Sequence, residues 1–193
     1  MRFYILLLPI ILFSCGENAE KKETIATDSI TANKTITKVE TTPSITKREV
    51  QVNAFLQSKL PGQWVMVNDE IAKWPKDVFD YFIAAKRKAD HDYPYLALGD
   101  FNVDGKRDYA MLVTSYDRTK YRIAIALDTS KIIIWDDDVQ GAAINTHPKE
   151  DLGSIDGKKA KLKGEAINVE FFEKSAWVLY WDGKTFQKIW TAD

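Results

Sequence analysis

The pattern of hydrophobic and polar positions has a helical period between residues 46 and 88 and a strand period after residue 95. Between residues 46 and 88 the apolar side chains recur at helical spacing and form one stripe in the stretch Val78, Phe79, Phe82 and Ile83. Thr46 to Glu49 fit a capping box, and Pro75 suits the first turn of a helix. The pattern therefore predicts two helices, one from residue 46 to Pro61-Gly62 and one from Pro75 to about residue 88.

The pattern after residue 95 is that of strands. Short runs rich in β-branched and aromatic residues are separated by turn signals, among them Asp156-Gly157 and Asp182-Gly183. The expected strands span residues 95–98, 109–114, 121–127, 132–135, 167–172, 176–181 and 185–190, and a short strand at 63–67 precedes them. The fold class expected is α+β, with an antiparallel β-meander following two helices.

The first residues have the form of an export signal. Arg2 is followed by an apolar run from Phe3 to Phe13. A membrane-spanning helix needs about 20 apolar residues, so this run indicates a signal peptide rather than a span. It ends at Leu12-Phe13-Ser14-Cys15, which resembles the bacterial lipobox. The resemblance implies cleavage after residue 14 and attachment of lipid, palmitate among its acyl chains, to Cys15.

Two details bear on this export signal. Gly16 is not the Asp that often retains lipoproteins in the inner membrane, which favours an outer-membrane location in the cell envelope. Cys15 is the single cysteine of the chain, so no intramolecular disulfide can form. An ordinary secretory signal with a chance cysteine is the alternative.

Composition divides the remainder of the chain. Residues 15–45 carry the lipidated cysteine and a segment rich in Thr, Lys and Glu, which we expect to be a disordered tether. Residues 46–193 form the expected globular domain, since 45% hydrophobic and 12% aromatic residues suffice for one core. The net charge of −1 gives no electrostatic footprint for nucleic acid. The six tryptophans either pack in the core or form a surface on which sugars stack.

One loop carries recognisable chemistry. Oxygen-bearing side chains stand at its positions 1, 3, 5 and 9, which are Asp100, Asn102, Asp104 and Asp108. Gly105 permits a sharp turn at position 6, and the backbone carbonyl of Lys106 falls at position 7. Calcium takes about six to eight hard oxygen ligands in flexible geometry. A metal-free turn rich in Asn, Asp and Gly is the alternative.

The loop is not a complete EF-hand. Met111 stands at position 12, where an EF-hand has Glu, and the residues that follow the loop have the pattern of a strand. The segment from Gly99 to Val113 resembles instead the calcium loop of the FG-GAP/VCBS-like repeat family. That resemblance implies Asp100, Asn102, Asp104 and Asp108 as side-chain ligands, with Lys106 contributing its carbonyl. The loop occurs once, so we expect a single propeller-blade-like sheet rather than a propeller.

The resemblance has a second, weaker part. The closing segment from Val178 to Asp193 resembles the final hairpin of small bacterial lipoproteins that carry one such loop.

No catalytic group stands out in the sequence. His91 and His147 are the two histidines, neither at a metal-ligand spacing, and we expect both at the surface. Asp136, Asp137 and Asp138 form either a solvated turn, a second cation site or an acid–base cluster. There is no nucleophile elbow, P-loop or HExxH motif. We therefore expect no enzyme, no catalytic residues and no cofactor besides Ca²⁺.

The sequence leaves two functional hypotheses. The first is a noncatalytic binding or scaffold module, anchored to the membrane through lipid on Cys15, stabilised by calcium and recognising a protein partner as inhibitors and immunity proteins do. The second is an extracytoplasmic hydrolase or glycan-binding protein that uses the aromatic residues and Asp136 to Asp138. Aromatic residues on one exposed concave face would favour the second hypothesis, and their burial would favour the first.

Overall fold

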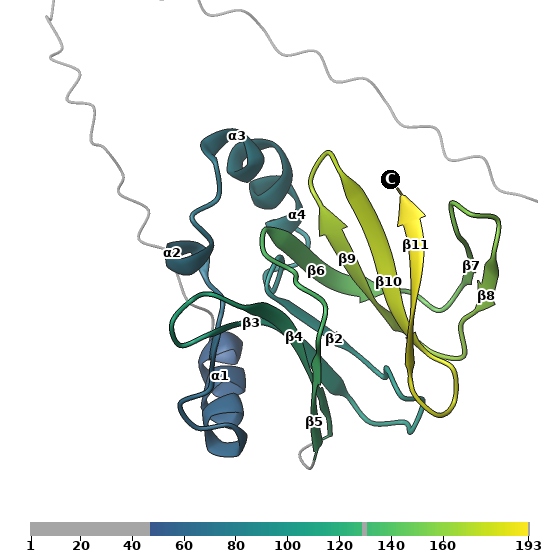
Figure 1. Cartoon of the computed structure of the whole chain (residues 1–193), viewed down its shortest axis with the longest axis horizontal. Coiled ribbons are helices and arrows are strands. Elements are labelled where there is room, and N and C mark those ends of the chain that lie inside the picture. The colour runs from purple at the N-terminus through teal and green to yellow at the C-terminus, as the bar shows by residue number, and fades with distance from the viewer. Residues whose placement is uncertain (1–46, 129–130, 193) are drawn as a thin grey trace, which may run out of the picture. The chain divides into compact units, whose positions relative to one another are not determined.

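The computed structural model describes residues 47–128 and 131–192 (Figure 1). The signal peptide, Cys15, the tether and Thr46 of the expected capping box lie outside the described residues. Within the described part, no helix is long and apolar enough to cross a membrane.

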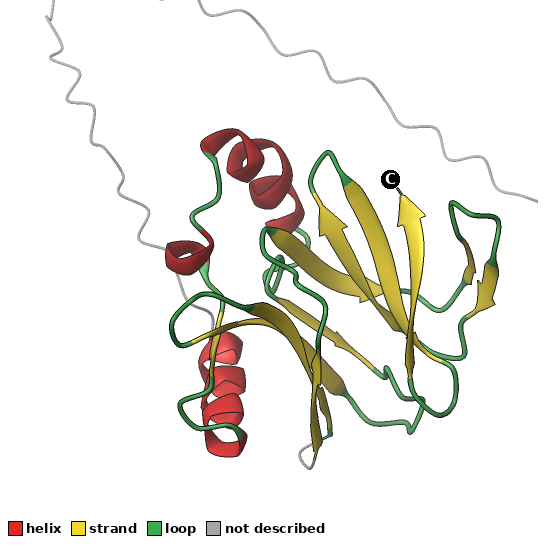
Figure 2. Ribbon diagram, in the orientation of Figure 1, coloured by secondary structure: helices red, strands yellow, loops and turns green. Residues whose placement is uncertain are grey.

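The helices come first in the chain. They are α1 (Lys47–Lys59), α2 (Asp69–Ala72) and the consecutive segments α3 (Lys76–Val78), η1 (Phe79–Ile83) and α4 (Ala84–Arg87). Figure 2 shows them in red, and in the chain all of them precede β2. The two expected helices are present, but the second one contains a π-helical segment, η1. The short α2 was not expected; Asn68 caps it by accepting a hydrogen bond from the amide of Ile71.

The first sheet has five antiparallel strands. They are β1 (Trp64–Met66), β2 (Leu96–Gly99), β3 (Asp108–Ser115), β4 (Tyr121–Leu127) and β5 (Lys131–Trp135). The order is β1-β3-β4-β5, and β2 also pairs with β3. β1 meets the C-terminal half of β3 and β2 its N-terminal half, so both lie along the same edge of β3. Gln57 of α1 donates a hydrogen bond to the carbonyl of Trp64, which places α1 over the outer edge of β1.

The second sheet has four antiparallel strands. They are β6 (Ala142–His147), β9 (Ala166–Phe171), β10 (Ser175–Trp181) and β11 (Phe186–Ala192), in the order β11-β10-β9-β6. A separate hairpin, β7 (Asp151–Gly153) and β8 (Lys159–Lys161), stands between β6 and β9 in the chain, with Asp156-Gly157 at its turn as expected.

The two sheets meet along β2 and β6. The hydroxyl of Thr146 donates to the carbonyl of Leu98 and accepts from its amide. One apolar cluster draws side chains from both sheets, among them Ile125 of the first and Ile144 and Trp177 of the second. The α+β class with an antiparallel meander is confirmed. The strands divide between two sheets and a hairpin, where a single blade-like sheet was expected, because the segment at 142–147 forms a strand that pairs with β9.

A polar network ties the helical region to the first sheet. Both terminal nitrogens of Arg87 bond the carboxylate of Asp69 at 2.9 Å, and the hydroxyl of Tyr95 donates to the same carboxylate at 2.6 Å. The indole of Trp74 donates to that hydroxyl at 2.7 Å. Burial raises the pKa of Asp69, but the hydrogen bonds from Arg87 and Tyr95 and the charge of Arg87 outweigh it, so that pKa lies below its usual range.

Candidate functional site

The loop from Asp100 to Arg107 connects β2 to β3 and is held at its base by two buried residues. The side chain of Phe101 is 0% exposed and belongs to the apolar cluster shared by the sheets. Asp108, at the start of β3, is also 0% exposed. The residues between Asn102 and Arg107 reach solvent. The loop is therefore anchored in the core while its polar tip is accessible.

The predicted ligands Asp100, Asn102 and Asp104 face the inside of the loop. Both carboxylate oxygens of Asp100 accept hydrogen bonds from loop amides, those of Asp104 at 3.0 Å and Gly105 at 2.9 Å. The side-chain oxygen of Asn102 accepts from the same Asp104 amide at 3.1 Å. Asp104 in turn accepts from the amide of Lys106 at 2.8 Å. The Asn102 and Asp104 bonds are Asx turns, and the shared Asp104 amide brings an oxygen of Asp100 close to that of Asn102.

Asp108 holds the base of the loop in place through hydrogen bonds. One of its carboxylate oxygens accepts from the amides of Phe101 and Asn102, at 2.9 and 3.3 Å, and the other accepts from the amide of Asp128 at 3.0 Å. Burial raises the pKa of Asp108 above its usual range; the three amides oppose this, and the charge of Asp104 adds to it. Asp108 thus joins both ends of the loop to the end of β4.

Two backbone conformations show how tightly the loop turns. Gly105 has φ of 83°, in the left-handed region that glycine adopts without steric cost. Val103 also has a positive φ, of 63°. A β-branched residue is an outlier in that region, so the loop holds Val103 in a strained conformation.

Sequence reasoning missed two acidic residues that contact the loop. Glu165, just before β9, accepts a hydrogen bond from the amide of Asp100 at 2.9 Å. Asp128 pairs with the ammonium of Lys106 at 3.1 Å. Next to Glu165, a Cβ on Gly164 would lie 2.9 Å from the carbonyl oxygen of Asp100, so only glycine allows this approach. The loop is therefore clamped against the lead-in to the second sheet, and no local signal connects residues so far apart in sequence.

The chemistry of these side chains suits a hard cation. Each carboxylate oxygen that accepts one hydrogen bond keeps further acceptor capacity, and hard oxygens are the ligands that calcium prefers. Among the described residues, however, no group of three or more His, Cys, Asp or Glu side chains is placed to hold a metal ion together. Asp100 and Asp108 each direct both carboxylate oxygens to backbone amides. Calcium at Asp100, Asn102, Asp104, Lys106 and Asp108 stays a prediction.

The large aromatic side chains are mostly withdrawn from solvent. Trp177, Tyr93, Tyr95 and Phe101 are among the largest fully buried side chains, whereas Tyr81, Tyr116 and Trp190 are the exposed aromatic residues of the described part. These three residues lie on different elements, η1, the β3–β4 connection and β11. One local exception surrounds Trp190.

This exception is a shallow depression of about 310 Å³, here called the Trp190 depression. Its lining includes Asp137, Asp138, Lys174, Trp177, Lys188 and Trp190. The Trp190 depression therefore brings Asp137 and Asp138 next to two tryptophans.

Asp136, Asp137 and Asp138 have different partners. Arg122 bonds Asp136 at 3.1 Å and lies 3.5 Å from Asp138. Asp137 accepts from Lys188 at 2.6 Å and from the indole of Trp135 at 3.0 Å. Burial raises the pKa of Asp137, but these two hydrogen bonds and the charges of Lys188 and Arg122 outweigh it and leave that pKa below its usual range.

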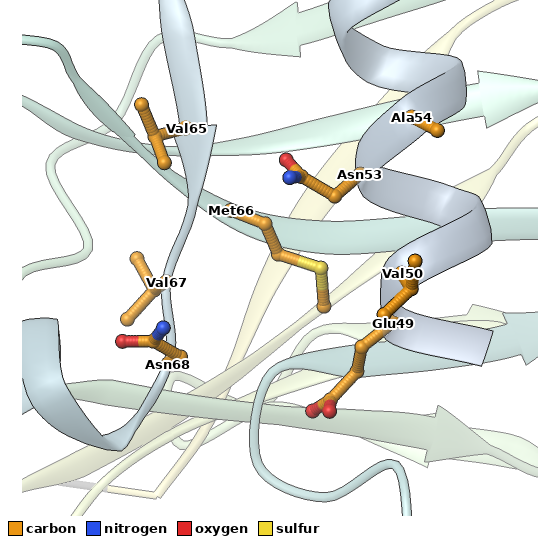
Figure 3. Close-up of a pocket in the computed structure, with 8 residues that line it drawn as sticks. All are labelled: Glu49, Val50, Asn53, Ala54, Val65, Met66, Val67 and Asn68. Carbon is orange, nitrogen blue, oxygen red and sulfur yellow. The ribbon is translucent and has the colours of Figure 1, made fainter. Parts of the chain in front are cut away.

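A second hollow, of about 330 Å³, lies between α1 and β1 (Figure 3). Its lining is mainly apolar and includes Val50, Val65 and Met66. In Figure 3 the side chain of Asn53 points from α1 toward β1, and its amide oxygen is the one buried side-chain polar atom of the described residues without a hydrogen-bond partner. If the side-chain amide of Asn53 is rotated so that its oxygen and nitrogen change places, a different atom faces the buried position. Asn53 alone therefore does not define a binding site.

One of the two histidines is exposed, and the side chain of the other is 17% exposed. His91 is exposed in the turn after α4, as expected. His147 ends β6 rather than lying in a loop, and its ring contacts the carbonyl of Pro148 at 2.8 Å and the carboxylate of Glu150 at 3.4 Å.

Comparison with known proteins finds no relative of this chain. No protein-family model, no curated protein and no solved structure matches the chain.

Proposed function

We propose that the protein is a lipid-anchored, noncatalytic binding module of the cell envelope, and that one calcium ion in the loop from Asp100 to Asp108 stabilises its folded domain. The observation that carries the proposal is the shape of the loop. Asp100 and Asn102 direct side-chain oxygens at one amide, and the buried Asp108 supports the loop from below.

The physical reason for calcium is electrostatic. Three carboxylates in one short loop repel one another, and a divalent cation removes that cost. Lys106 offsets only part of the charge, because its ammonium pairs with Asp128. A cation that binds the folded loop and not the unfolded chain stabilises the fold in proportion to the logarithm of its concentration.

Calcium titration by calorimetry, with melting followed in excess chelator, tests this part of the proposal on a chain beginning at Thr46. We expect one saturable site, a higher melting temperature with calcium, and loss of both on Asp104→Ala. Asp156→Ala is the matched control, because Asp156 also precedes a glycine in a polar turn but lies in the β7–β8 hairpin. Absence of heat together with an unchanged melt would make the loop an ordinary turn.

The anchor is tested separately. Cys15→Ser should release the protein from the membrane fraction and abolish incorporation of a palmitate analogue. Lipidation at Cys15 would be contradicted if the parent and the variant were both membrane-bound and neither incorporated the palmitate analogue.

The binding role requires a partner. For an inhibitor or immunity-type protein, co-purification from solubilised envelopes should recover a specific protein, and repeated recovery of none would count against this role. A general acid needs a raised pKa, whereas, despite burial, the hydrogen bonds from Lys188 and Trp135 hold that of Asp137 below its usual range, so Asp137 does not suit that role in a hydrolase.

A further inference from the structure

We infer that the Trp190 depression binds a neutral saccharide. The inference deepens the proposed function, since it rests on the domain being a binding module and names a class of ligand for one of its surfaces. Three properties of the depression carry it: an exposed indole, balanced charges, and hydrogen-bonding groups of both kinds.

The indole comes from a cross-strand pair. Trp177 of β10 and Trp190 of β11 are register partners, with ring centroids 6.5 Å apart. Trp177 is 2% exposed and belongs to the core, whereas Trp190 is 41% exposed. The buried ring therefore supports an accessible one. An indole face is electron-rich and apolar, which suits the C–H face of a pyranose ring.

The charges that line the depression exclude most charged ligands. Two aspartates, Asp137 and Asp138, face two lysines, Lys174 and Lys188, so there is no excess of either sign. The ammonium of Lys188 lies 5.3 Å from the ring centroid of Trp177 and 5.0 Å from that of Trp190. An organic cation would compete with this ammonium for both rings, and an anion would meet the two carboxylates. A pyranose would stack on the part of the Trp190 ring that Lys188 leaves exposed. A ligand without net charge fits best.

The polar groups match sugar hydroxyls. A hydroxyl both donates and accepts. The Asp138 side chain is 65% exposed and offers acceptor oxygens, and the exposed Lys174 offers donors. The volume of about 310 Å³ is at the lower end of the range for ligand sites. The depression therefore suits a short saccharide or the end of a longer one.

The test uses the full-length protein in a zwitterionic detergent, which avoids sugar head groups. Cellotetraose, xylotetraose, maltotetraose and tetra-N-acetylchitotetraose are the neutral probes, and an oligogalacturonate is the anionic control, each titrated by calorimetry. We expect saturable binding of at least one neutral probe. Trp190→Ala should weaken that binding at least about tenfold, and Lys174→Ala several-fold. Tyr116→Ala, which removes an exposed aromatic ring in the β3–β4 connection, should leave it unchanged.

Several results would overturn the inference. They are no saturable binding of any neutral probe, preference for the anionic probe, equal affinity of the Trp190→Ala variant, or occupation of the depression by a partner protein alone. Lys174→Ala keeps the test valid if Trp190→Ala fails to fold. Saccharide binding without calcium binding would contradict only the calcium loop, and calcium binding without saccharide binding would contradict only this inference.

Discussion

The carboxylate of Glu165 accepts a hydrogen bond of 2.9 Å from the backbone amide of Asp100, across 65 residues of sequence. This bond joins the loop at the end of β2 to the start of β9. It therefore connects the two sheets through the same loop to which the calcium prediction applies.

Glu165→Gln should destabilise the domain by about 1 kcal/mol, because a neutral amide is a weaker acceptor than a carboxylate. Urea unfolding measures the change. Glu173→Gln, at an exposed position in the β9–β10 turn, is the matched control and should have almost no effect. Equal stability of the two variants would show that the Glu165 contact contributes nothing.

Gly164→Ala should cost about 1–3 kcal/mol, because the added Cβ meets the Asp100 carbonyl oxygen at 2.9 Å and a methyl group of Val103 at 2.8 Å. Backbone cannot move aside as a flexible side chain can. Gly153→Ala in β7 has nothing within 4 Å of the new Cβ and should be neutral or slightly stabilising. Thermal melting of the two variants compares them directly, and a neutral Gly164→Ala would mean that the loop yields.

Val103→Asn should stabilise the domain by about 1 kcal/mol, because asparagine tolerates a positive φ far better than a β-branched residue. Val50→Asn, at a similarly exposed valine in α1, should leave stability almost unchanged, since valine and asparagine have similar helix propensities and asparagine caps nothing there. Chemical denaturation decides the sign. A loss of stability at Val103 would indicate that its packing against Gly164 outweighs the backbone strain.

Asp69 should make stability depend on pH in the acid range. Its folded pKa is below the usual value of 3.8, so its contribution is fully present above that value and is lost as pH falls through the folded pKa. Asp69→Asn should cost about 2 kcal/mol at neutral pH, because Arg87 then lacks its charged partner.

Unfolding of the parent and the Asp69→Asn variant, followed from neutral pH downward, checks this dependence. The two free energies of unfolding should converge as the pH drops below the usual aspartate pKa. A difference that stays constant throughout the acid range would contradict the assignment.

Local signals predict most of the elements. The Asp-Gly turns locate the β7–β8 and β10–β11 hairpins, and β4 and β5 fall within a residue of their expected bounds. Strand β6 was missed because Ala142–His147 is rich in small and polar residues, and it forms a strand through pairing with β9. The division into two sheets follows from that strand.

The candidate sites also differ in how far the sequence predicts them. The loop residues from Asp100 to Asp108 are local in sequence, so their spacing identifies them. Glu165 and the meeting of Asp137 with Trp190 depend on strands that pair far apart along the chain, and no spacing predicts such contacts. The π-helical turn at Phe79–Ile83 also escapes the apolar pattern, which fits an ordinary helix equally well.

The position of α1 has a mechanical consequence. Any force along the chain from its N-terminal side enters the described domain at Lys47, and α1 resists it through the buried Val52 and Leu56 and the ion pair of Arg48 with Asp92. These contacts lie in succession along one helix, so they are loaded one after another. Unwinding of its 13 residues would lengthen the chain by about 25 Å before either sheet is strained.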